Sequence, residues 1–94
     1  MITTSTVKTA YAAPYLKRLC KHFAHKIPAT IDGSRGTLEF PFGECVIDVD
    51  ESEMRIRIEV KSSDDLDRAE RVVADHLVRM ANRDEPVVSW QRAD

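Results

Sequence analysis

The chain has 94 residues, of which 43% are hydrophobic and 32% charged, and its formal net charge at pH 7 is −2. This length fits a single domain spanning residues 1–94 with one core, and the composition excludes a disordered chain. No apolar run approaches the ~20 residues of a membrane span and no secretory signal is evident, so we expect a cytoplasmic protein whose cysteines, Cys20 and Cys45, stay reduced.

The first predicted elements are a strand and an amphipathic helix. Residues 3–9 are rich in β-branched side chains, which favour a strand. The helix accepts Pro14 in its first turn and ends at Pro28, because proline lacks the amide proton that a helix interior needs. Its apolar stripe follows three- and four-residue spacings and consists of Leu16, Leu19, Cys20, Phe23 and Ile27.

Four short strands with turns between them are predicted next, over residues 29–31, 37–40, 44–49 and 54–60. Apolar and polar side chains alternate along the last two, so one face of the sheet is apolar and the other is wet. Acids outnumber bases on the wet face and no aromatic side chain lies among them, so we expect no nucleic-acid binding there. The residues of this face are Thr37, Glu39, Glu44, Val46, Asp48, Arg55, Arg57 and Glu59.

A second long helix follows, with Ser62 and Ser63 as candidate N-caps and Pro86 as its stop. Residues 87–90 are a candidate last strand. The order β-α-β-β-β-β-α(-β) predicts an α+β fold, a four- to six-stranded antiparallel sheet with two helices on one face. This order resembles one repeat of the TATA-box-binding protein fold, which by itself implies no activity.

The most suggestive segment for function is residues 17–26, which carry six basic or titratable nitrogen side chains and no acid. On a helical wheel Arg18, His22 and His25 fall opposite the apolar stripe. The simplest interpretation is a solvated helix face whose cations complement the helix dipole. The alternatives are a contact to an anion or partner, and a metal site, since histidines three residues apart can converge on one ion.

The remaining candidate residues point to structural roles. Cys20 and Cys45 both fall on inward faces, where small thiols are usually packing residues rather than a redox pair. His76 flanks the apolar stripe of the second helix, and a ring nitrogen bonded locally is the simpler interpretation. The sequence contains no nucleotide loop, catalytic triad or zinc-protease helix, so it supports neither an enzyme nor a bound cofactor.

Two runs of the sequence carry a resemblance to a known family. Residues 15–26 (YLKRLCKHFAHK) and residues 72–85 (VVADHLVRMANRDE), with Trp90 after them, resemble the signatures of a bacterial group catalogued as domain of unknown function 2218. The pattern Gly36-x-Leu38-x-Phe40 and the later Gly43 also fit. The chain departs from the family at Met80, where an aromatic is expected, and at Asp84, where glutamate is common.

The resemblance implies a bacterial domain, some members of which lie fused to or beside siderophore-interacting flavoprotein reductases. Our leading hypothesis is therefore a small non-enzymatic binding or accessory module in iron or siderophore handling. Arg18, His22 and His25 would contact an anionic siderophore complex or a partner reductase. Alanine variants of these residues, titrated with ferric siderophores and a reductase, test the hypothesis.

Two alternatives remain open. Residues 1–38 carry six bases and one acid, and the remainder carries eight bases and fifteen acids, so charges of +5 and −7 make up the net −2. This split could hold a structural homodimer together, which sedimentation at low and high salt tests. The other alternative is a metal- or haem-binding protein that uses His22 and His25, which metal analysis of the purified protein tests.

Overall fold

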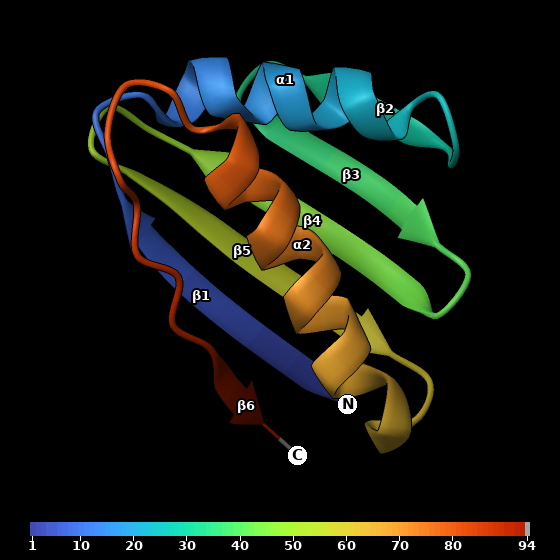
Figure 1. The fold of residues 1–94 in the computed structure, drawn as a ribbon. Coiled ribbons are helices and arrows are strands. Elements are labelled where there is room, and N and C mark those ends of the chain that lie inside the picture. The colour runs from blue at the N-terminus through green and yellow to red at the C-terminus, as the bar shows by residue number, and fades with distance from the viewer. Residues whose placement is uncertain (94) are drawn as a thin grey trace.

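The computed structural model describes residues 1–93 and places two helices on one side of a six-stranded antiparallel sheet (Figure 1). The strands lie in the order β2-β3-β4-β5-β1-β6. In chain order the elements are β1 (Ile2–Lys8), α1 (Ala12–Phe23), β2 (Ala29–Asp32), β3 (Arg35–Phe40), β4 (Gly43–Val49), β5 (Glu53–Val60), the 3₁₀ turn η1 (Ser63–Asp65), α2 (Leu66–Met80) and β6 (Gln91–Ala93).

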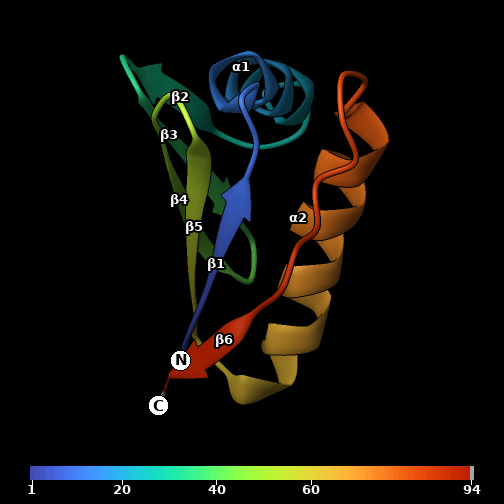
Figure 2. The same cartoon turned by 90° about the vertical axis from the view of Figure 1, so that its left-hand side faces the viewer.

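The rotated view shows the sheet on one side and the two helices on the other (Figure 2), and the buried apolar side chains lie between them. Alternate residues of β5 are buried along its length, because successive side chains of a strand point to opposite faces. Val73 and Leu77 of α2 are fully buried against this face. Each large apolar side chain so buried contributes about 1.5–3 kcal/mol before the entropy of ordering is subtracted.

The predicted α+β fold is confirmed. Strands β2 to β5 form the expected meander of neighbouring antiparallel strands. The first strand joins it beside β5, with Ile2 opposite Glu59 and Lys8 opposite Glu53. In the described part of the chain, no helix is long and apolar enough to cross a membrane.

The first helix ends earlier than its apolar stripe suggests. Its last residue is Phe23, and the predicted stripe member Ile27 lies in a turn beyond it. Both Lys26 and Ile27 donate their backbone amides to the Phe23 carbonyl, at 2.9 Å each. Pro28 explains the turn, because the residue before a proline avoids helical backbone angles. His25 is therefore outside the helix.

The last strand lies at Gln91–Ala93 instead of the predicted residues 87–90. Pairing with β1 begins only where Gln91 lies opposite Thr4. Upstream of this point, Asp84 accepts a hydrogen bond from the Thr9 hydroxyl at 2.6 Å, and Trp90 packs against the core. These two anchors fix the path of the segment, so that it meets the edge of β1 only at its end.

Candidate functional site

The first helix presents two polar flanks on either side of its buried face. One flank carries Lys17 and Lys21, which lie beside Ile31 of the edge strand β2. The other carries Arg18 and His22 and faces α2. Both Tyr15 and Phe23 belong to the buried face between them. The basic residues of α1 are thus divided between two environments.

On the flank that faces α2, contacts join the two helices. The Arg18 guanidinium donates to the Met80 carbonyl at 3.2 Å, and so satisfies a carbonyl at the C-terminal end of α2. The His22 ring lies beside the His76 ring of α2, with centroids 5.1 Å apart. We call this surface the cationic flank, and its members are Arg18, His22, His25, Lys26, His76 and Arg79.

The surroundings of His22 in the cationic flank change its pKa. Desolvation by the packed rings lowers the pKa of His22 below its usual range, and the charges of His76, Lys26, His25 and Arg79 lower it further. All of these charges are positive. Among residues 1–93, neither Arg18, Lys26 nor Arg79 forms a salt bridge, although Asp75 stands one helical turn before Arg79. No salt bridge within residues 1–93 therefore neutralises the charges of these three bases.

The structure thus separates the three residues that the sequence grouped together. Arg18 and His22 do share a side of α1, but Arg18 is bonded to α2 and His22 is half-buried against it. His25 is exposed in the turn after the helix. The ring that packs beside His22 is His76, and sequence reasoning missed this pair because it treated each helix alone.

The local bond predicted for His76 is present: its Nδ1 lies 2.6 Å from the carbonyl oxygen of Val72. Phe23 lies against the same ring, with centroids 4.7 Å apart. The cysteines are buried and free. Burial raises the pKa of Cys45 to about 12, so its thiolate is scarce near neutral pH and the residue suits packing rather than redox chemistry.

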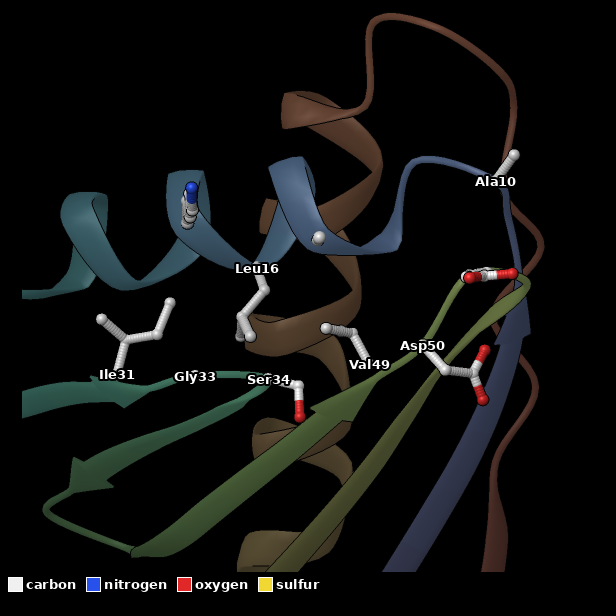
Figure 3. A pocket seen from close by; sticks show the side chains of 10 residues that line it. Ala10, Leu16, Ile31, Gly33, Ser34, Val49 and Asp50 are labelled. Carbon is white, nitrogen blue, oxygen red and sulfur yellow. The ribbon is translucent and has the colours of Figure 1, made fainter.

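A second surface feature is a hollow of about 450 Å³ between α1 and the β2–β3 hairpin. Leu16, Ile31 and Val49 direct apolar side chains into it, and Asp50 points away (Figure 3). The Asp50 carboxylate is bonded to Arg55 at 2.8 Å, which holds its pKa well below the usual range. The hollow is therefore large enough for a small ligand, but few polar groups point into it, and the cationic flank is the better candidate site.

The open face of the sheet carries charged side chains, some of which pair with one another. Arg35 and Asp48, opposite each other on β3 and β4, form a salt bridge at 2.7 Å. Further along the strands, Glu44 lies directly between Glu39 and Glu59 in the register. Like charges side by side on a sheet are unfavourable, and this cluster of three glutamates repels phosphates.

Comparison with known proteins identifies the family. Residues 4–91 match the family described as "Uncharacterized protein conserved in bacteria (DUF2218)". The fold is similar to the NMR structure of PA4090 from Pseudomonas aeruginosa, with a TM-score of 0.81 and 35% sequence identity over 99% of this chain and 97% of that chain. No curated protein matches. This chain therefore belongs to that family of uncharacterized bacterial proteins.

Proposed function

We propose that this protein is a small, non-catalytic binding module that accepts an anionic ligand on the cationic flank. The carrying observation is that Lys26 and Arg79 both lie near His22 and that neither forms a salt bridge within residues 1–93. An anion bound there would relieve the mutual repulsion of side chains contributed by α1, the turn after it and α2. Guanidinium and ammonium groups are the side chains that proteins use for carboxylates and phosphates.

The salt bridges of four bases elsewhere on the molecule support this choice. Lys8, Arg35, Arg55 and Arg92 each form salt bridges of 2.9 Å or less with acids of this chain. Their positive charges are therefore already compensated within the fold. The bases of the cationic flank, in contrast, keep their charge available for a ligand.

The proposed anion is a ferric siderophore complex, or an acidic patch on a siderophore-interacting reductase, in the cytoplasm. This class follows from the reductases that accompany some family members. Ferric complexes of catecholates and carboxylates carry negative charge, which suits the flank. The order of elements also resembles one repeat of the TATA-box-binding protein, but the acidic open face argues against a nucleic-acid ligand.

A charge-matched pair of double variants tests the proposal. Lys26→Ala with Arg79→Ala removes two charges from the cationic flank, and Lys17→Ala with Lys21→Ala removes two from the other flank of α1. Calorimetric titration with a ferric catecholate complex should show at least about tenfold weaker binding for the first variant only, equivalent to about 1.4 kcal/mol. Titration of the same variants with a siderophore-interacting reductase tests whether the flank binds that protein.

Both double variants change the net charge equally, so a nonspecific charge effect would weaken binding in both alike. That result, or the absence of binding by the wild-type protein, would rule the proposal out. None of the four substituted residues forms a side-chain hydrogen bond within residues 1–93; they are Lys17, Lys21, Lys26 and Arg79. Both variants should therefore melt close to the wild-type temperature, which confirms that a loss of binding is not a loss of fold.

A further inference from the structure

Two histidines from different helices meet at the surface between α1 and α2. The rings of His22 and His76 have centroids 5.1 Å apart and planes inclined by 45°. Phe23 packs against both, at 5.4 Å from His22 and 4.7 Å from His76. Both rings are half-buried, so they are held in place and still reached by solvent.

The nitrogens of this pair are available for a ligand. A carbonyl oxygen only accepts hydrogen bonds, so the 2.6 Å contact to Val72 requires that Nδ1 of His76 carry its proton. Nε2 of the neutral ring then keeps its lone pair. Histidines that bind metals usually show this arrangement, in which the second nitrogen donates to a carbonyl or carboxylate. Within residues 1–93, the ring nitrogens of His22 have no hydrogen-bond partner.

The separation of the rings fits a tetrahedral metal centre. Zinc-bound imidazole nitrogens lie about 2.0–2.1 Å from the metal, which places the centroids of two rings at a tetrahedral ion about 5 Å apart. Ligation of one haem by both histidines does not fit, because two axial ligands lie on opposite faces of the porphyrin, and here the two rings pack together.

We propose that His22 and His76 together bind a divalent metal ion with tetrahedral preference, of the Zn²⁺ class, and thereby join α1 to α2. In the described part of the chain, no third histidine, cysteine or carboxylate completes a metal cluster. The remaining positions would be taken by water or an anion, so the site is an open one rather than a closed structural site. The inference rests on the ring geometry and does not require the proposed anion site.

The neighbouring cations should affect the affinity of the histidine pair for a metal ion. Positive charge from Lys26 and Arg79 opposes a bare dication, and favours one that carries anionic ligands. Removing these two charges should therefore strengthen the binding of Zn²⁺ while it weakens the binding of an anionic complex. The two proposals predict changes of opposite sign in the same double variant, so the failure of one is distinguishable from the failure of the other.

The test uses the metal-free protein and three single variants, His22→Ala, His76→Ala and His25→Ala. We expect Zn²⁺ to bind with one ion per chain and to raise the melting temperature, because a ligand that binds only the folded state stabilises it. Each of the variants His22→Ala and His76→Ala should weaken Zn²⁺ binding at least about tenfold. His25→Ala, a matched control from the same segment, should not weaken it.

Titration with Co²⁺ gives a spectroscopic readout of the same site. Tetrahedral Co²⁺ absorbs strongly in the visible, and octahedral Co²⁺ only weakly. The proposal predicts a strong absorption band that disappears when Zn²⁺ displaces the Co²⁺ ion. The band should also be absent from both the His22→Ala variant and the His76→Ala variant. The proposal is overturned if the band is absent from the wild-type protein, or if the band remains in the His22→Ala variant or in the His76→Ala variant. Melting of each variant without metal shows whether it is folded before it is titrated.

Discussion

At the scale of single residues, Tyr15 connects the two ends of the chain. Its side chain is fully buried, and its hydroxyl donates to the Asp84 carboxylate at 2.6 Å. The same hydroxyl accepts from the backbone amides of Arg83 and Asp84, at 3.1 and 3.2 Å. Thr9 donates to the other carboxylate oxygen. One phenol thus anchors the segment that follows α2.

Replacing Tyr15 with phenylalanine should destabilise the protein by about 1–3 kcal/mol, because it leaves two amides and a carboxylate oxygen without their partner. Urea unfolding measures this loss, and hydrogen exchange should show faster opening at residues 82–86. Tyr11→Phe is the matched control, since Tyr11 is partly exposed and its hydroxyl makes no hydrogen bond within residues 1–93. Equal stability of the two variants would contradict the anchoring role.

At the scale of elements, the position of α1 on the sheet depends on Gly36 of β3. A Cβ atom there would lie 2.7 Å from Leu16 Cδ1 and 2.8 Å from Cys20 Sγ, both in the buried face of the helix. Atoms this close cannot coexist, so the missing side chain allows α1 to approach the strand. The helix in turn places Arg18 and His22 beside α2.

Gly36→Ala should therefore force the buried side chains of Leu16 and Cys20 aside, shift α1 with them, and cost about 1–3 kcal/mol, the usual range for overpacking a core. Because the helix carries His22, the same change should disturb metal binding by the His22–His76 pair. Gly33→Ala is the comparison: it has nothing within 4 Å, and its cost comes only from a φ of +60°. Unfolding midpoints compare the two, and a Gly36→Ala variant as stable as the wild type with an unshifted helix would refute the role of close approach.

At the scale of the whole molecule, the basic and acidic parts of the sequence contact each other within the fold. Lys8 bonds to Glu53 at 2.7 Å, and Arg35 to Asp48 at 2.7 Å, so two of the bases in residues 1–38 are compensated inside the chain. The charge split along the sequence is therefore not a split between two lobes. A homodimer held by it stays a prediction, which sedimentation at two salt concentrations decides.

These ion pairs and the Asp84 anchor predict acid sensitivity. Hydrogen bonds to Arg92, Lys8 and Thr9 lower the pKa values of Glu70, Glu53 and Asp84. A carboxyl group whose pKa is lower in the folded state contributes stability above its unfolded pKa, about 4, and loses it as the pH falls through the folded value. Melting temperature should therefore fall steeply below about pH 4.

A variant separates this effect from general charge repulsion. Arg92→Gln removes the guanidinium that donates to Asp67 and Glu70, so the pKa values of both carboxyl groups should rise towards the ordinary range, although Glu70 keeps its hydrogen bond from Thr3. Its melting temperature should then depend less on pH below about pH 5 than that of the wild type. Lys61→Gln, an exposed charge outside the salt bridges, is the control. If both variants show the wild-type slope, the ion pairs of Arg92 do not contribute to acid unfolding.

The sequence alone determined the two helices and the first five strands, and the face that α1, β4 and β5 bury, but it placed the last strand too early. The alternation at residues 54–60 specified a half-buried strand, and the stripe from Leu16 to Phe23 specified a helix with one inward side. Such periods are local, because they depend on the geometry of one strand or one helix. The proline before β2 limited the helix for the same local reason, although its last turn was predicted too long.

Only the tertiary structure decided which side chains meet. His22 lies beside His76, and Tyr15 holds Asp84, because α1 and α2 cross on one face of the sheet and the chain returns along its edge. A period gives the direction of a side chain relative to its own helix axis, and it contains no information about the neighbour in that direction. That neighbour is fixed by the packing of distant elements against a common core, and the proposed metal pair depends on it.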